Sequence, residues 1–242
     1  MATYKCSGIV IKRSNLGEAD RILTIFTDKF GKIKAVAKGV RKTLSKLSGF
    51  LELFCVDDLL LAEGRSLDTV AGAVTTKCFK NLRGNLKATQ TAFYFAEIID
   101  KLTEDREPHK EIFELLENSL EHLDGKKNDL LISYFEFNFL AETGFHPELN
   151  KCISCSKKLE EAGNFFSFES GGLMCKNCRH DIGHSISSEA IKVLRLFLQH
   201  RISVIDKLKT ENNLSKEIRQ ITRGYLKHTS GKELKSEGYL YE

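Results

Sequence analysis

The sequence predicts an α+β protein, in which an N-terminal β-barrel is followed by an all-helical domain with an inserted four-cysteine metal module. Short alternating segments separated by turn residues fill residues 1–80, and helical periodicity dominates after residue 81. Four of the seven cysteines lie close together, between positions 152 and 178. We therefore expect a barrel domain over 1–80 and a helical domain over 81–242, interrupted at 149–184 by the metal module.

The composition is that of an ordinary globular protein. The 242 residues are 41% hydrophobic and 29% charged, and only two are proline. No apolar run approaches the roughly 18–20 residues that span a bilayer. The first fifteen residues lack the small-residue cleavage site of a signal peptide. These observations favour a cytoplasmic protein that does not enter a membrane.

The charge is distributed unevenly along the chain. Residues 1–80 hold 14 Lys and Arg against 8 Asp and Glu, and residues 151–242 hold 16 against 11. Between them, residues 81–150 hold only 7 basic residues against 14 acidic ones. The net charge of +4 is thus the sum of basic segments at both ends and an acidic segment in the middle. This asymmetry indicates that the segments have different partners.

The predicted barrel consists of five short strands. Two of them flank the turn Asp28–Gly31 and predict a hairpin, and a basic loop, Gly39–Leu47, follows. Five strands within 80 residues, separated by turn signals, are typical of a small barrel. The expected strands are Lys5–Lys12, Arg21–Thr27, Lys32–Lys38, Phe50–Ala62 and Leu67–Thr76.

The helical region is predicted from apolar residues that recur every three or four positions. The expected helices are Leu86–Leu102, Pro108–Leu123, Leu130–Thr143, 187–200 and Leu214–His228. Ser187 or Ser188 and Ser215 are candidate N-caps, and Gly144 and Gly231 are candidate C-terminal stops.

The most specific motif is a pair of Cys-x2-Cys knuckles separated by nineteen residues. Cys152, Cys155, Cys175 and Cys178 have the spacing at which two tight turns bring four thiolates to one ion. Four soft ligands favour Zn²⁺, and four protein ligands leave no position for water, so one structural zinc per chain is expected. Two disulfides are the alternative. His180 and His184 follow the second knuckle. They are expected to be surface imidazoles, and the alternative is that they are spare ligands.

Two sets of basic residues suggest nucleic-acid contacts. Period-2 alternation places Lys32, Lys34 and Lys38 on one strand face, and the basic loop adds Arg41, Lys42 and Lys46. On the last helix, Lys216, Arg219, Arg223 and Lys227 follow one stripe. A solvated face with no ligand is the alternative for both sets, and also for the acidic stripe Glu111, Glu114, Glu117 and Glu121.

The sequence gives no sign of catalysis, so a non-enzyme is expected. No P-loop, G-x-S-x-G or H-E-x-x-H motif occurs. His146-Pro147-Glu148 before the first knuckle is superficially like a zinc deaminase motif, but Lys151 replaces the expected proline and a second knuckle competes for the metal.

Several motifs, in order along the chain, resemble those of the RecO family of bacterial recombination mediator and annealing proteins. They are Ser7–Lys12, Gly17–Ile22, Phe26-Thr27, Phe30–Lys32 and Ala37–Arg41 at the start, Phe135-Glu136, Gly144-Phe145, Pro147–Leu149 and the first knuckle in the middle, and Tyr225-Leu226, His228, Gly231 and Leu234–Ser236 near the end.

This resemblance implies an OB-fold barrel that binds single- and double-stranded DNA and anneals complementary strands. It also implies partnership with RecR, contact with the acidic tail of single-stranded DNA-binding protein, and help in loading RecA during repair at the nucleoid. Among the early strands only Phe26 and Phe30 are candidates to stack bases, so backbone contacts are expected to dominate. The expected DNA-binding residues are Lys12, Arg13, Arg21, Lys32, Lys34, Lys38, Arg41, Lys42, Lys46, Arg219 and Arg223.

Two other functions remain open from the sequence. One is a zinc-containing nucleic-acid-binding protein of transcription or translation. The other is an enzyme such as a zinc hydrolase, which four cysteine ligands argue against because they leave no place for a catalytic water.

Overall fold

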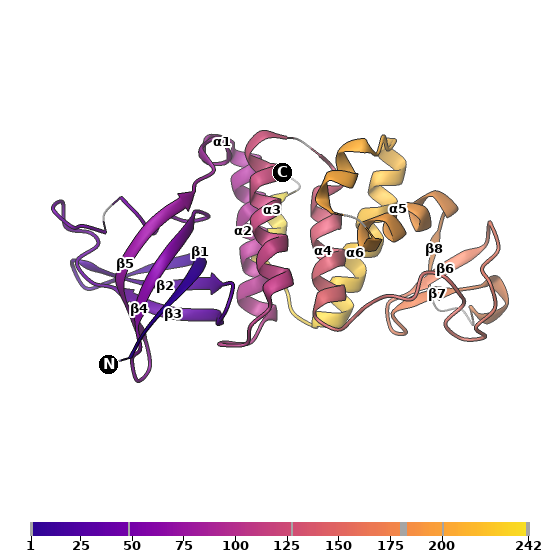
Figure 1. Cartoon of the computed structure of the whole chain (residues 1–242). Helices are drawn as coiled ribbons and strands as arrows, with labels where there is room; N and C mark the ends of the chain where they lie inside the picture. Colours follow the sequence, from indigo (N-terminus) through magenta and orange to yellow (C-terminus); the bar gives the residue numbers. More distant parts are fainter. Residues whose placement is uncertain (1, 48, 127, 180–182, 200, 241–242) are drawn as a thin grey trace. The chain divides into compact units, whose positions relative to one another are not determined.

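A computed structural model describes residues 2–47, 49–126, 128–179, 183–199 and 201–240. The chain forms two compact units (Figure 1). Unit 1 comprises residues 1–126 together with 234–242, and unit 2 comprises residues 127–233.

Unit 1 begins with a closed five-stranded barrel of OB-like topology. The strands are β1 (Thr3–Leu16), β2 (Asp20–Thr27), β3 (Gly31–Ala37), β4 (Val56–Ala62) and β5 (Asp68–Lys77), paired in the order β1-β2-β3-β5-β4. The β3–β5 pair is parallel and the others are antiparallel. Alternate aliphatic side chains such as Val10, Ile25 and Leu61 fill the interior and leave it closed to water. The predicted barrel is confirmed.

The fourth strand begins later than its apolar sequence suggested. Leu51 and Phe54 have φ values of 63° and 64°, which belong to a turn and not to a strand. Both side chains are buried, and the Phe54 N–H donates to the Val10 carbonyl, 3.0 Å away. Burial of these side chains thus holds residues 51–54 as a tight segment against β1, and β4 starts only at Val56.

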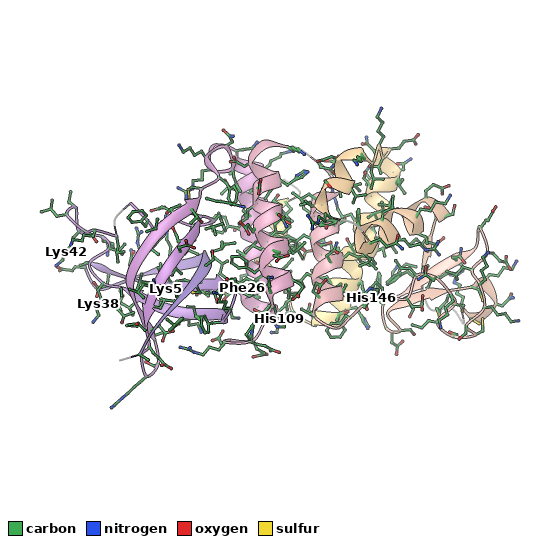
Figure 2. All side chains as sticks on the ribbon, in the orientation of Figure 1. Lys5, Phe26, Lys38, Lys42, His109 and His146 are labelled. Carbon is green, nitrogen blue, oxygen red and sulfur yellow. A yellow bond between two sulfur atoms is a disulfide. The ribbon has the colours of Figure 1, made fainter. Side chains whose placement is uncertain are left out.

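Helices pack directly against the barrel within unit 1. They are α1 (Lys80–Gly84), α2 (Leu86–Leu102) and α3 (Lys110–Gly125), and the short 3-10 helix η3 (Lys235–Leu240) packs on α2. Phe26 of β2 is fully buried, with its ring centroid 6.4 Å from that of Phe113 on α3. Figure 2 shows Phe26 at the side of the barrel nearest these helices. The barrel and α1–α3 therefore share apolar packing.

A buried carboxylate fastens the connection between α2 and α3 to the barrel. Asp68 is fully buried and accepts hydrogen bonds from Tyr4, from the Gly64 N–H and, on both carboxylate oxygens, from Nη2 of Arg106. Burial alone would raise the pKa of Asp68, but these donors hold it below its ordinary value. Gly31 completes the junction, because a Cβ built there would lie 1.9 Å from the Glu107 carbonyl oxygen.

The three cysteines outside the metal module fall into two groups. Cys6 is a buried free thiol, and burial raises its pKa to about 12. Cys55 and Cys78 are instead joined as a disulfide, with their Cα atoms 4.5 Å apart. The sequence did not reveal this pair, whose members are 23 positions apart, because only the folded β4–β5 hairpin brings its two ends together.

Unit 2 is built around a helix that is buried over most of its length. This helix, α4 (Leu131–Glu142), contacts both α5 (Ser188–Gln199) and α6 (Asn212–Ser230), and η2 (Ile202–Lys207) also packs on it. Glu136 of α4 is fully buried and accepts a hydrogen bond of 2.6 Å from Thr222. The remaining elements are β6 (Asn164–Ser167), β7 (Gly172–Met174), η1 (Lys176–Cys178) and β8 (His184–Ile186), which belong to the cysteine region.

The helix ends confirm most of the predicted capping signals. Ser187 caps α5 by accepting from the Ala190 N–H at 3.2 Å, Gly144 with φ = 93° directly follows the C-cap Thr143 of α4, and Gly231 ends α6 with φ = 57°. Ser215 was wrong as a cap, because α6 begins at Asn212 and Ser215 is buried inside it, hydrogen-bonded to Thr210. Within the described residues, no helix is long and apolar enough to span a bilayer.

Candidate nucleic-acid interface and metal centre

A group of exposed cations lies on β3, just after its end, and on the basic loop Gly39–Leu47 that follows it. Lys34 and Lys38 are exposed, while their neighbours Ala35 and Ala37 are buried, as strand alternation requires. Arg41, Lys42 and Lys46 of the basic loop are exposed as well. Figure 2 shows Lys38 and Lys42 at the end of the barrel away from α2 and α3. The chain thus presents clustered positive charge at one end of the barrel.

The basic loop is held in a defined shape by its neighbours. The Arg41 N–H donates to the Ala19 carbonyl at 3.0 Å, and the Arg41 guanidinium donates to the Gly17 carbonyl at 3.1 Å. The Gly39 N–H donates to Asp20 at 2.7 Å. These bonds fix the loop beside the β1–β2 turn, which is one of the loops that OB-folds use for oligonucleotides.

Other expected DNA-binding residues carry partners within unit 1. Lys12 lies 3.0 Å from Asp100, Arg13 lies 2.9 Å from Glu52, and Lys34 lies 3.3 Å from Asp105. These ion pairs are largely exposed, so each is weak and a phosphate can compete for the cation. Arg21 of β2 is only half-buried.

Lys32 does not belong to this exposed face, contrary to the sequence-based expectation. It is 5% exposed, and its ammonium donates to the carbonyls of Asp100 and Thr103 at 2.5 and 2.7 Å. Both carbonyls belong to the C-terminal end of α2, where a cation is favoured. The helix covers this end of β3, so Lys32 joins the strand to α2 and is not available to DNA.

The basic stripe on α6 is only partly exposed. Lys216 and Lys227 are exposed, whereas Arg219 and Arg223 are half-buried and have interactions within the protein. The structure therefore gives Arg219 and Arg223 a packing role in unit 2 in addition to their charge. Nothing in their geometry singles them out as DNA contacts.

One exposed cation was missed by the sequence analysis. Arg65 lies in the β4–β5 loop, the second loop that OB-folds use for oligonucleotides. The turn sequence Glu63–Ser66 between two predicted strands was a sufficient signal to find it.

The acidic stripe on α3 is partly neutralised by the barrel. Lys77 at the end of β5 lies 2.7 Å from Glu117 and 3.7 Å from Glu121. Hydrogen bonds and charge from these carboxylates raise the pKa of Lys77. Part of the stripe thus helps α3 to pack on β5 and is not simply a solvated face.

The four cysteines of the two knuckles meet at one point in unit 2. Their sulfur atoms all lie within 4.8 Å of one another, and Cys152 and Cys175 are buried. The first knuckle is closed by the Ser156 N–H donating to the Cys152 carbonyl at 2.8 Å, and the second by the Cys178 N–H donating to the Cys175 carbonyl at 3.0 Å. This cluster can hold a metal ion.

The donor set suits a soft divalent cation. Burial opposes a charge on the Cys152 sulfur, but the backbone N–H groups of Cys155, Cys175 and Ser154 outweigh it and lower the pKa of Cys152 to about 6. All four cysteines are free thiols and form no disulfide with one another. A cluster of four free sulfurs in tight turns is the arrangement of structural zinc sites.

Neighbouring histidines do not join this cluster. His184 is exposed and stacks on Phe168 with a centroid distance of 4.1 Å, which confirms it as a surface imidazole. His180 lies outside the described residues. In the part of the chain that the structure describes, the four cysteines are the only such metal-ligand group, so His146 and Glu148 form no deaminase-like site.

The two candidate stacking residues of the barrel differ in exposure. Phe26 is fully buried, whereas Phe30 is half-buried and meets Tyr4 edge-on with a centroid distance of 4.5 Å. Phe26 therefore offers no aromatic face to a base, and Phe30 packs partly on the barrel core.

Comparison with known proteins covers almost the whole chain. Residues 1–79 match the family model described as Recombination protein O N terminal, and residues 83–238 match Recombination protein O C terminal. The chain is 39% identical to the DNA repair protein RecO of Dehalococcoides mccartyi over 98% of this chain and 94% of that one. It is 32% identical to the DNA repair protein RecO of Bacillus pumilus, over 98% and 93% of the two chains.

Proposed function

This chain belongs to the RecO family, with a role in DNA repair and recombination, and we propose that it is a mediator that anneals complementary single strands. The ordered basic loop beside the β1–β2 turn carries this proposal. We infer that Lys38, Arg41, Lys42 and Lys46 contact DNA phosphates, with Lys12, Arg13, Arg21 and Lys34 extending the path over the barrel. Arg219 and Arg223 remain weaker candidates.

Annealing follows from the electrostatics of such a surface. Two DNA strands repel each other through their phosphates, and a protein that neutralises phosphates on both strands lowers that repulsion. Base pairing then supplies the driving force, so no nucleotide hydrolysis is required. Because the contacts are to phosphates, binding is independent of sequence and falls steeply with salt.

We further propose the partners that the family suggests. The chain would act with RecR on DNA coated by single-stranded DNA-binding protein, contact the acidic tail of that protein, and help RecA to load. This work would take place in the cytoplasm, at the nucleoid. These partners rest on family membership and are tested by pull-down with each purified protein.

We assign one zinc ion per chain to Cys152, Cys155, Cys175 and Cys178. Four protein ligands leave no position for a water molecule, so the ion would fold the segment 149–184 and supply no catalysis. We also propose that the chain works as two functional domains. One is an OB-fold domain over 1–80, and the other is a helical domain over 81–242 that the zinc module interrupts.

The test is a strand-annealing assay on a variant in which Lys38, Lys42 and Lys46 are all changed to Gln. Losing three phosphate contacts should reduce the slope of log affinity against log salt for single strands by about 2. The annealing rate at about 50 mM salt should fall together with the affinity for single strands. Affinity and annealing rate are measured by fluorescence anisotropy and by quenching between labelled complementary strands.

The matched control changes three exposed lysines on the helices, Lys80, Lys87 and Lys110, to Gln, which alters the net charge equally. It should retain most of the affinity and the annealing rate. Equal losses in both variants would contradict the assignment of the basic loop. Preferential binding of one folded RNA, without annealing, would favour a transcription or translation protein instead.

A further inference from the structure

Unit 1 contains a cavity of about 570 Å³ that the DNA path described above does not use. Ile11 of β1, Leu53, and Phe93 and Ala96 of α2 form an apolar floor. Tyr239 of η3 closes the cavity from another side. Its walls thus come from the barrel, a helix and the C-terminal segment, all within one compact unit.

Two aromatic rings are exposed at this cavity. Phe93 is 43% exposed and Tyr239 is 59% exposed, which is unusual for large side chains that line an apolar floor. Phe93 is held in place by the buried Phe54, whose ring meets it edge-on at a centroid distance of 5.0 Å. This contact fixes the orientation of the Phe93 ring, which keeps 43% of its surface exposed.

The rim of the cavity is positive on balance. Four cations line it, Lys12, Arg13, Lys101 and Lys235, against two carboxylates, Glu97 and Asp100. Asp100 pairs with Lys12 at 3.0 Å, Glu97 pairs with Lys101 at 2.7 Å, and Arg13 pairs at 2.9 Å with Glu52, which lies outside the lining. Two more cations than carboxylates therefore line the cavity, and the Arg13 pair is one that a phosphate can replace. The remaining charge favours an anionic ligand.

We propose that this cavity receives an unpaired base of single-stranded DNA, which stacks on Phe93 while the rim cations hold the neighbouring phosphates. The inference rests on the proposed function and deepens it by naming where bases are held. A flat ring beside a positive rim is the usual combination in single-strand binding. It also supplies an aromatic face, which the fully buried Phe26 of the barrel does not offer.

Continuity with the barrel favours DNA over an acidic peptide as the occupant. Lys12 and Arg13 lie on β1, the strand that leads to the β1–β2 turn beside the basic loop. One strand of DNA held on the basic loop can therefore continue along β1 to the cavity. A bound peptide would use the cavity without requiring that continuity.

The experiment measures the affinity of the full-length Phe93→Leu variant for two oligomers of equal length. One is oligothymidylate and the other is an abasic deoxyribose-phosphate chain. Leu keeps the apolar floor and removes the ring, so affinity for oligothymidylate should fall about fivefold or more. Affinity for the abasic chain should stay within about twofold, and Phe93→Trp should restore oligothymidylate binding.

The matched control is Leu86→Ala, which removes an exposed apolar side chain from the same helix outside the cavity. An equal loss for both oligomers, or no loss for either, would overturn the base site while leaving annealing by wild type intact. If wild type binds neither oligomer, the proposed function itself fails. A further outcome is that an acidic phenylalanine-containing peptide binds wild type but not Phe93→Leu, while the two proteins bind DNA with equal affinity. That result would assign the cavity to a protein partner and overturn the base site.

Discussion

A buried lysine limits how far the basic face of the barrel extends. Strand alternation places Lys32, Lys34 and Lys38 in one row, but α2 covers the first of them. A lysine taken out of water is tolerated only when its ammonium has partners, and the carbonyls of Asp100 and Thr103, with the Asp105 carboxylate 3.4 Å away, provide them. The same residue type therefore stabilises the fold at position 32 and faces solvent two residues later.

We expect Lys32→Met to destabilise unit 1 without weakening DNA binding. The change keeps the apolar stem but leaves two carbonyls at the end of α2 without their donor, which costs about 2 kcal/mol. For a chain of this length that corresponds to a fall in Tm of roughly 4–8 °C. Thermal unfolding followed by circular dichroism measures it, with the exposed Lys34→Met as control; equal Tm values would contradict the structural role of Lys32.

A carboxylate on α2 ties down the C-terminal segment. Glu97 accepts hydrogen bonds from the Lys235 and Ser236 N–H groups at 3.0 and 2.7 Å and from the Ser236 hydroxyl at 2.5 Å. Burial opposes its charge, but these donors and Lys101 together lower the pKa of Glu97 from 4.5 to about 2. The folded state thus binds the proton on Glu97 more weakly than the unfolded chain does.

We expect η3 to loosen from α2 as the pH falls from about 4.5 to about 2. A carboxyl with a lowered folded-state pKa stabilises the fold above its unfolded value, and this stabilisation is lost as the pH drops through the folded value. Hydrogen exchange of residues 234–240 across this range measures the loosening. Glu97→Gln should already exchange fast at pH 7, and protection that is unchanged in this variant would refute the idea.

Among the elements, the two cysteine knuckles are short turns with little packing of their own. A few residues, such as Met174, Ile153 and Leu159, form a small apolar cluster around the sulfurs. A segment with so little buried surface needs an additional link to stay folded, and a metal ion is the usual one. The spacing of the cysteines therefore predicted the structure of this segment better than its weak strand pattern did.

We expect Cys175→Ser to lose the bound zinc and to unfold the segment around β6–β8 locally. Removing one of four ligands breaks the tetrahedral site, and the binding free energy is also folding free energy for this module. Elemental analysis of the purified protein should show about one zinc in wild type and none in the variant. Cys6→Ala, which changes a buried free thiol of the barrel, should keep its zinc; wild type without zinc under reducing conditions would disprove the assignment.

At the scale of the whole molecule, the chain returns to its first unit at the very end. Residues 127–233 form unit 2, whereas η3 packs back on α2 of unit 1. The last described residues therefore stabilise a helix more than 130 residues away in sequence, as the bonds from Glu97 to Lys235 and Ser236 illustrate.

We expect a chain that ends at Glu233 to lose stability in unit 1 only. Without η3, Glu97 loses its backbone donors and the apolar face of α2 is exposed to water. Hydrogen exchange should rise in α2 and stay unchanged in α4–α6. A chain that ends at Leu240 keeps η3 and serves as control, and faster exchange spread evenly over both units would contradict this account.

The local features of this protein could be predicted from its sequence: the barrel strands, most helices, the helix ends at Ser187, Gly144 and Gly231, and the metal knuckles. These follow from periodicity, glycine at a helix end and cysteine spacing, which are short-range signals. Only the tertiary structure decided that Lys32 is buried, that Cys55 meets Cys78, and that Phe93 and Tyr239 share a cavity. Each of these depends on which segments pack together, and a local pattern cannot state which surface a distant helix will cover.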